Sequence, residues 1–294
     1  MDISIIIVNW NTRQMLDNCL NSIYRETRKI TFETFVVDNG SSDGSAGTVK
    51  EKYPQVRLIE NRDDLGFAAA NNQALKLVSG RYVLILGPDT IILENAIDKG
   101  VEFMDSRSDI SILGPKAFNG NMTRRKTVFP DPFMAQQIIL LTKIRYFFPW
   151  LKIIKKIQSR GFDFDYSREQ QVKGHIEGAC MFFRKEILDR IGFFDEKFFI
   201  WFEEVDLCLR AKRAGYKIFY SPELKIIHYG GESFKQEMTL LKQRRYNRSL
   251  SYYFWKNKPH WQYFVLQIFG PLSLLLAFFV DVIKKHRKIV YVSR

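Results

Sequence analysis

The chain has 294 residues, of which 46% are hydrophobic and 26% are charged. This balance excludes a disordered or fibrous protein and allows one large domain with an appended segment. The formal net charge of +13 is concentrated at the end, because residues 242–294 hold eleven Lys/Arg and one acid, Asp281. Long apolar runs interrupt this basic, aromatic segment, so it suits an anionic membrane surface better than nucleic acid.

Strands and helices are predicted to alternate through the first part of the chain. Short β-branched or apolar runs predict strands over 3–8, 32–37, 56–60 and 82–86, and helical spacing predicts helices over 12–24, about 45–52 and 66–79. This order predicts an α/β fold with a parallel sheet covered by helices. Asp38 and Asp89 each follow a predicted strand, and ligands bind at such carboxyl ends.

Two later segments suggest membrane contact. Residues 133–160 are apolar and aromatic with six Lys/Arg, and Pro149 divides them into two predicted helices, either a core pair or, as we favour, a basic interfacial element. Residues 262–283 are apolar over about 20 residues, enough to cross a bilayer, but Gly270-Pro271 interrupts them. Because both flanks are positive, we expect in-plane or re-entrant attachment rather than a single span.

The three cysteines, Cys19, Cys180 and Cys208, are widely spaced and include no Cys-x-x-Cys pair. This spacing predicts neither a disulfide framework nor a zinc site, and it favours a reducing cytosol. The chain opens directly on a short apolar run, so we expect no secretory signal peptide.

An acidic cluster follows the apolar run 199–202. Glu203, Glu204 and Asp206 would therefore lie against apolar surface, where carboxylate pKa values rise and a general base can form. The alternative is an acidic first turn of a helix, favoured by the helix dipole, in which Asp206 pairs with Arg210 four residues on.

Several motifs, in this order, resemble those of the family 2 glycosyltransferases of GT-A fold, especially the rhamnosyltransferase-like branch. They are SIIIVNWNT (4–12), VVDNGSSDGS (36–45), LGFAAANN (65–72), GPDT (87–90), GACM (178–181), GFFDE (192–196), EEVDL (203–207) and HYGGES (228–233). The resemblance implies a GT-A domain over 1–240, with a nucleotide-sugar-binding half (1–115) and an acceptor half (116–240). Residues 241–294 would form a helical, membrane-associating tail.

The resemblance implies inverting transfer of a sugar from a nucleoside diphosphate to a hydroxyl of a lipid-linked saccharide, aided by Mg²⁺ or Mn²⁺. Asp89 and His228 would bind the metal, because an oxygen and an imidazole nitrogen suit either cation. Glu204 matches the general base, and Glu203 is the second candidate. Gly87 stands where the family has the first carboxylate of its Asp-x-Asp motif, which leaves Asp89 as the acid there.

The resemblance also implies a set of nucleotide-binding positions. They are Val8, Asn11, Asp38, Asn61, Gly66 and Asn72. A carboxylate at Asp38 accepts from N3–H of uracil or thymine but not from cytosine, so it does not separate UDP-sugars from dTDP-sugars. Asp38, Asp89 and His228 could alternatively be turn residues, and Asn72 could cap local structure.

The leading donor is dTDP-rhamnose, and the implied setting is bacterial surface polysaccharide synthesis at the cytoplasmic face of the inner membrane. One alternative is a UDP-hexose or UDP-N-acetylhexosamine transferase of the same fold. Another is a non-catalytic, membrane-docked nucleotide-binding module. A dinucleotide-dependent oxidoreductase is disfavoured, because Asn9-Trp10-Asn11-Thr12 follows the first strand in place of Gly-x-Gly-x-x-Gly.

Overall fold

The computed structural model describes residues 1–144, 163–231 and 239–292, with five single positions between 144 and 163, and side chains in the last helix as far as 282. The first half of the predicted 133–160 helix pair forms α5 (Met134–Thr142). The predicted division at Pro149 lies outside the described residues.

Four strands form the parallel half of the main sheet, in the order β3-β2-β1-β4. They are β1 (Ile3–Asn9), β2 (Phe32–Asn39), β3 (Arg57–Asn61) and β4 (Tyr82–Leu86), as the sequence pattern predicts. The connecting helices are α1 (Arg13–Glu26), α2 (Ser45–Lys52) and α3 (Phe67–Leu75). Asn9 pairs with Asp38 in the register of β1 and β2, so the polar strand ends meet at one edge.

The sheet continues past β4 in the order β11-β6-β12-β5. These strands are β11 (Cys180–Arg184), β6 (Ile110–Phe118), β12 (Lys217–His228) and β5 (Thr90–Leu93), with short additions β7 (Arg124–Arg125) and β9 (Gln170–Gln171). In this half β6 and β12 are parallel, but β11 is antiparallel to β4 and β6, and β5 is antiparallel to β12. The prediction of a parallel sheet is therefore correct for the first half, and the second half is mixed. A separate two-stranded sheet joins β8 (Val128–Phe129) and β10 (His175–Ile176).

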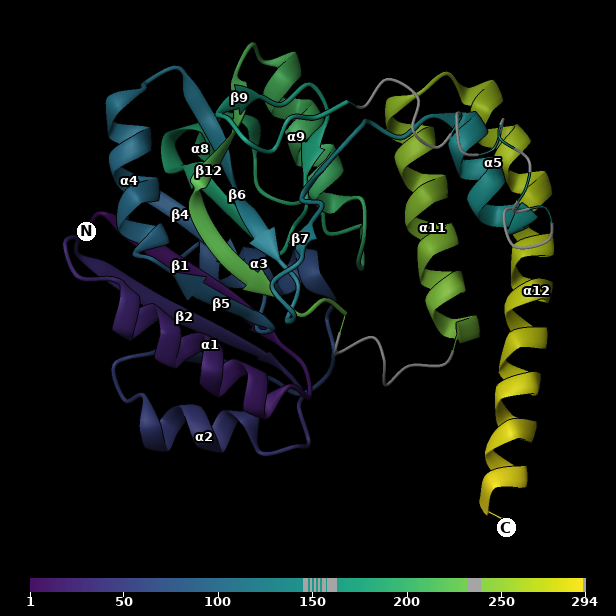
Figure 1. The fold of residues 1–294 in the computed structure, drawn as a ribbon, viewed down its shortest axis with the longest axis horizontal. Coiled ribbons are helices and arrows are strands. Elements are labelled where there is room, and N and C mark those ends of the chain that lie inside the picture. The colour runs from purple at the N-terminus through teal and green to yellow at the C-terminus, as the bar shows by residue number, and fades with distance from the viewer. Residues whose placement is uncertain are drawn as a thin grey trace.

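Helices cover both faces of the sheet, which explains the continuous β-branched run in β1. Ile3, Ile5 and Ile7 pack with α1, α2 and α4 (Ala96–Ser106) on one face. Ile6 packs on the other face with α3, α8 (Lys185–Ile191) and α9 (Glu203–Arg213). Figure 1 shows α1, α2 and α4 along one side of the strands.

A helical layer stands beside the sheet domain and consists of α5, α11 (Thr239–Asn257) and α12 (His260–Val292) (Figure 1). A third apolar cluster joins this layer to the start of α9, with Phe202 and Val205 against Tyr253 and Phe254. The first residues of α9 therefore lie between the sheet domain and the tail helices.

The predicted interruption at Gly270-Pro271 is wrong, because α12 is continuous through Pro271. Packing against α11 holds this turn in the helix. Asn247 of α11 donates from Nδ2 to the Gly270 carbonyl (3.2 Å) and to Ser273 Oγ (2.7 Å). A re-entrant hairpin at this point is therefore not formed.

Within the described chain, His260–Val282 is the helical stretch whose length and composition would allow it to cross a membrane. Its exposed apolar side chains recur at helical spacing on one face. They are Trp261, Phe264, Ile268, Leu272, Leu275, Phe278 and Phe279, which we call the α12 stripe.

Candidate active site

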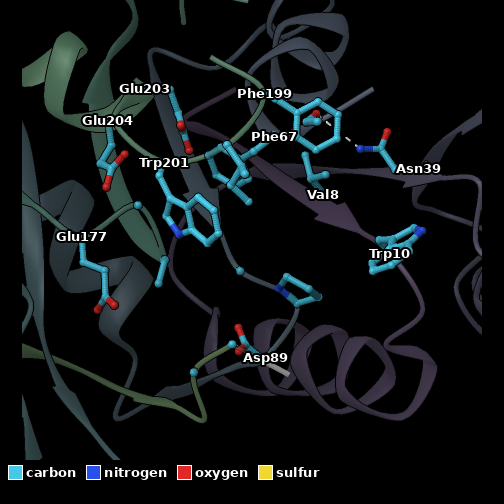
Figure 2. A pocket seen from close by; sticks show the side chains of 18 of the residues that line it. Val8, Trp10, Asn39, Phe67, Asp89, Glu177, Phe199, Trp201, Glu203 and Glu204 are labelled. Carbon is cyan, nitrogen blue, oxygen red and sulfur yellow. Dashed lines mark hydrogen bonds between the residues drawn. The ribbon is translucent and has the colours of Figure 1, made fainter. Parts of the chain in front are cut away.

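A cavity of about 460 Å³ opens where the carboxyl ends of β1 and β4 approach the start of α9. Its volume is in the range usual for small-molecule sites. Figure 2 shows Val8, Trp10 and Asn39 on one side, and Glu203 and Glu204 on the other. The cavity therefore has a polar and aromatic end and a carboxylate end.

Asp89 and His228 meet in this cavity because β5 and β12 are antiparallel neighbours, with His228 opposite Thr90. The Tyr229 N–H donates to the Asp89 carbonyl (3.0 Å) and fixes the two loops together. Asp89 Oδ1 lies 3.4 Å from His228 Nε2, and both side chains are buried. Burial alone would lower the pKa of His228, but the carboxylates of Asp89 and Glu177 outweigh it and raise that pKa to about 9.

Glu177, which the sequence did not single out, extends this pair. Its Oε2 lies 3.5 Å from His228 Nδ1, and its Oε1 accepts a hydrogen bond from Arg125 Nη2 at 3.1 Å. Burial would raise the pKa of Glu177, but His228 and then Arg125 lower it below its usual value. Asp89, His228, Glu177 and Arg125 thus form a line of alternating charge along the cavity wall.

The Asp89–His228 pair fits a divalent cation. Asp89 Oδ1 and His228 Nε2 face each other at 3.4 Å, longer than a good hydrogen bond between them, and a bound cation would take the place of the proton that the two carboxylates hold on His228. Among the described residues, no group of three or more His, Cys, Asp or Glu is placed to hold a metal. Asp89 and His228 would supply two ligands to a bound cation, and Mg²⁺ in such sites takes its others from phosphate oxygens and water.

The turn before α9 directs Glu203 and Glu204 into the cavity. Trp201 and Phe202 precede the helix with φ values of 64° and 71°, both in the left-handed region that non-glycine residues rarely adopt. Packing holds this turn, with the Phe202 ring 5.5 Å from that of Tyr246. Such strain is concentrated at functional sites.

The two glutamates have different accessibility and raised pKa values. Burial, with a smaller effect of Glu177, raises the pKa of Glu204 to about 7. Burial and then the charge of Glu204 raise the pKa of Glu203 well above its usual value, and Glu203 is only 4% exposed. Glu204, the more exposed of the two, is therefore the one that can change protonation near neutral pH while facing the cavity.

The helix-start interpretation of the acidic cluster is also correct. Helix α9 begins at Glu203, and Asp206 Oδ2 accepts a hydrogen bond from Arg210 Nε at 2.8 Å. Lys256 and Asn257 of α11 also donate to the buried Asp206, at 3.0 and 2.9 Å. Asp206 therefore fastens the helix that carries Glu204 to the tail.

The structure brings together six of the ten predicted site residues. Val8, Gly66, Asp89, Glu203, Glu204 and His228 line the cavity. Asn11, Asp38, Asn61 and Asn72 are not among its lining residues. Asn11, Asp38 and Asn61 stand at or beside the carboxyl ends of β1, β2 and β3, and Asn72 lies in α3. All four side chains form hydrogen bonds within the protein.

Two of these four have well-defined local roles. Both oxygens of Asp38 accept hydrogen bonds, from Asn9 Nδ2 at 2.8 Å and from the Ser41 N–H at 3.0 Å. Asn72 donates to the Phe194 carbonyl (2.8 Å) and accepts from the Phe194 N–H (3.1 Å), so it fixes the GFFDE segment against α3.

The other two also bond within the protein. Asn61 Nδ2 donates to Asn39 Oδ1 and to Gln73 Oε1, each at 2.9 Å. Asn11 Oδ1 accepts from the Ser42 N–H at 2.8 Å. Both residues therefore order the loops around the cavity.

Gly66 serves a close approach of two loops. Its φ is +83°, and a Cβ at this position would lie 2.3 Å from the Phe199 carbonyl oxygen. The next residue, Phe67, donates its N–H to that same oxygen at 2.7 Å. Only glycine fits here, so Gly66 places the turn before α9 against the start of α3.

Sequence reasoning missed several lining residues. They are Trp10, Asn39, Asp64, Arg125, Glu177 and Arg245. Arg245 comes from α11, inside the segment that the sequence assigns to membrane contact, and it lies 3.6 Å from Asp64 Oδ2 and 4.1 Å over the Phe199 ring. No local sequence pattern indicates that an arginine of the tail points into the cavity.

Comparisons with known proteins show the family of the chain. Residues 4–192 match the model of Glycosyl transferase family 2, and residues 161–290 match that of Glycosyl transferase family group 2. The N-acetylglucosaminyl-diphospho-decaprenol L-rhamnosyltransferase of Mycobacterium tuberculosis is 23% identical over 242 residues, covering 78% of this chain and 76% of that protein. A low-salt glycan biosynthesis hexosyltransferase of Haloferax volcanii is 24% identical over 234 residues, covering 77% and 67%.

The fold is also shared with solved structures. A mannosyltransferase of Pyrobaculum calidifontis in complex with GDP-Man and Mn²⁺ superposes with a TM-score of 0.56 at 17% identity, covering 94% of this chain and 72% of that one. Residues 1–349 of TarS of S. aureus give a TM-score of 0.53 at 18% identity, covering 87% and 73%. The chain therefore belongs to glycosyl transferase family 2, and it is a glycosyltransferase with the GT-A fold.

Proposed function

We propose that this enzyme is an inverting hexosyltransferase. It moves a sugar, with L-rhamnose from dTDP-rhamnose as the leading candidate, to a hydroxyl of a lipid-linked saccharide. The observation that carries the proposal is that one cavity contains both the Asp89–His228 pair and the carboxylates of Glu203 and Glu204. One suits the departing diphosphate and the other suits the attacking hydroxyl.

The chemistry divides between the two ends of the cavity. In the transfer, a bond forms between the acceptor oxygen and the anomeric carbon, while the bond from that carbon to the diphosphate breaks. Glu204, with a pKa of about 7, accepts the proton that the acceptor hydroxyl loses. Mg²⁺ or Mn²⁺ held by Asp89 and His228 would supply positive charge beside the departing diphosphate. Because the chain is a glycosyltransferase, the alternative of a non-catalytic nucleotide-binding module is excluded.

The nucleoside would occupy the opposite end. Val8 and Trp10 offer apolar surface for a planar base, and Asn39 lies beside them (Figure 2). We keep Asp38 as the residue that recognises N3–H of uracil or thymine, because it lies near the end of β2, immediately before the lining residue Asn39. Asn11, Asn61 and Asn72 would support this end indirectly, by ordering the loops around it.

A donor panel tests the proposal. Purified enzyme is incubated with dTDP-rhamnose, UDP-glucose, UDP-N-acetylglucosamine and GDP-mannose, with Mg²⁺, Mn²⁺ or EDTA, and transfer is scored by mass spectrometry. We expect turnover of a dTDP- or UDP-sugar that EDTA suppresses. Turnover of UDP-glucose or UDP-N-acetylglucosamine alone would replace rhamnose with the alternative donor. Turnover of GDP-mannose alone would contradict the role of Asp38.

The tail geometry supports in-plane membrane attachment. Asp281 of α12 accepts hydrogen bonds from the N–H groups of Thr239 (3.0 Å) and Leu240 (2.8 Å), the first residues of α11. The two helices therefore run antiparallel side by side over the length of the apolar stretch (Figure 1). A vertical α12 would bring α11 into the bilayer with it.

Helix α11 does not suit the bilayer interior, because Arg244 and Arg248 are exposed on it. We propose that α12 lies in the membrane surface with its stripe inserted, and that residues 241–294 form a tail docked on a 1–240 catalytic domain at the cytoplasmic face of a bacterial inner membrane. Ile268, 72% exposed, is the test position. I268K should weaken sedimentation with anionic vesicles in high salt, and unchanged sedimentation would contradict the orientation.

A further inference from the structure

A second cavity, of about 690 Å³, lies between α11 and α12. Aromatic and apolar side chains form much of its wall, among them Tyr252, Trp255, Tyr263 and Leu274. Among the residues that the structure describes, its lining includes Arg248 and no acidic residue. We call this cavity the tail groove. Its chemistry suits a ligand that is apolar along most of its length and anionic at one end.

Two arginines of α11 line the tail groove and the active-site cavity, one each. Arg248 lines the groove and Arg245 lines the active-site cavity, three residues apart on α11. Residues at this spacing are neighbours on the helix surface, with about 5–6 Å between their Cβ atoms. A ligand with two adjacent anionic groups can therefore contact both guanidinium groups at once.

Arg245 is held in position for such a ligand. Its guanidinium stacks on Phe199 at 4.1 Å and lies 3.6 Å from Asp64 Oδ2. A guanidinium has five N–H donors, so pairing with Asp64 is compatible with binding a phosphate as well. The planar fork of an arginine also matches phosphate oxygens bidentately.

The groove borders the α12 stripe. The groove residues Pro271 and Leu274 are each followed by a stripe residue, Leu272 and Leu275. Consecutive helical positions differ by about 100° around the axis, so this wall of the groove adjoins the face that we place in the membrane. A lipid chain can pass from the bilayer into the groove without crossing the polar surface of the protein.

We propose that the tail groove binds the lipid part of the acceptor, a polyprenyl diphosphate. The first isoprene units lie in the groove, the diphosphate contacts Arg248 and Arg245, and the saccharide extends into the active-site cavity toward Glu204. This inference rests on the proposed function, in which the acceptor is lipid-linked. It assigns the tail helices a second role, in which they select the acceptor as well as attach the enzyme.

Binding of farnesyl diphosphate tests this assignment without knowledge of the acceptor sugar. The full chain in detergent is titrated calorimetrically, with the donor site filled by saturating UDP or dTDP and Mg²⁺. We expect farnesyl diphosphate to bind at least about tenfold tighter than farnesol or inorganic diphosphate. R248Q and R245Q should each raise its Kd about tenfold. R244Q is the matched control, because Arg244 is exposed on the same helix and lines neither cavity, and it should leave Kd unchanged.

A groove-filling variant tests the lipid half of the assignment. A Cβ at Gly270 would meet only Asn247 Nδ2, at 3.9 Å, and leucine is the better helix former, so G270L should fold. It should weaken farnesyl diphosphate and farnesol equally. Nucleotide affinity, measured on every variant, reports whether the fold and the donor site are intact, independently of the groove. If the wild-type enzyme does not bind the nucleotide, the proposed function is overturned. If R248Q or G270L binds farnesyl diphosphate as tightly as the wild-type enzyme does, the groove assignment alone is overturned.

Discussion

Replacing Glu204 with glutamine should make the enzyme slower and more stable at once. Glutamine keeps the shape of the side chain but cannot take a proton from the acceptor. Loss of a positioned general base costs about 100- to 10,000-fold in turnover. Because burial raises the pKa of Glu204 to about 7, the wild-type rate should fall about tenfold for each pH unit below 7, as the base becomes protonated.

The same pKa shift gives the expected change in stability. Glu204 binds its proton more tightly in the folded chain, with a pKa of about 7 against an ordinary value of 4.5. Its unfavourable effect on the free energy of unfolding is therefore absent below about pH 4.5 and develops as the pH rises to 7. Each pKa unit corresponds to about 1.4 kcal/mol, so the carboxylate costs about 3 kcal/mol above pH 7. E204Q should recover much of this at pH 8 and little at pH 4.

The assays are nucleoside diphosphate release across pH 5.5–8.5 and urea unfolding at pH 4 and pH 8. E203Q is the matched comparison, because Glu203 is more deeply buried and burial raises its pKa well above the usual value. We expect E203Q to stay within about tenfold of the wild-type rate. A rate for E204Q above a tenth of wild type, or a wild-type profile without an inflection near pH 7, would refute the assignment of the base.

Three further substitutions test the surrounding structure. H228A should lower turnover about 100-fold and weaken nucleoside diphosphate binding with Mn²⁺, because Asp89 alone then faces the diphosphate; equal calorimetric affinities would contradict this. G66A should cost about 2 kcal/mol in urea unfolding, because its Cβ would meet the Phe199 carbonyl, whereas G47A, where a Cβ would contact nothing, should be neutral or stabilising. D206N should lower the free energy of unfolding by about 3 kcal/mol, because it removes the buried negative charge that pairs with Arg210 and Lys256. A decrease of less than about 0.5 kcal/mol would contradict that role.

Local patterns in the sequence predict the parallel half of the fold well. The run over 3–8 is β-branched because both faces of β1 are buried, and the spacing of Leu16, Leu20 and Ile23 matches the buried face of α1. The second half of the sheet, β11-β6-β12-β5, was not anticipated, because strands such as β11 pair across long connections without a repeating βα pattern. Gly270-Pro271 indicated a break, but Asn247 on another helix holds that turn in α12.

The cavity was predicted in part. The acidic cluster stood out because charge directly after an apolar run is unusual, and Asp89 and His228 could be paired only through the family resemblance, since they are far apart in sequence. Glu177 was missed, and its position beside His228 depends on where the loop after β10 lies against β12. Arg245 was missed for a similar reason, because its role depends on how α11 docks on α9.

The configuration of the product at the anomeric carbon tests the central claim most directly. In the proposed transfer, Glu204 accepts a proton from the acceptor hydroxyl while that oxygen displaces the diphosphate from the opposite side of the sugar. Proton NMR of the product formed from a donor of known configuration reports the outcome. We expect inversion in every product molecule, and a product that keeps the configuration of the donor would refute the proposed transfer.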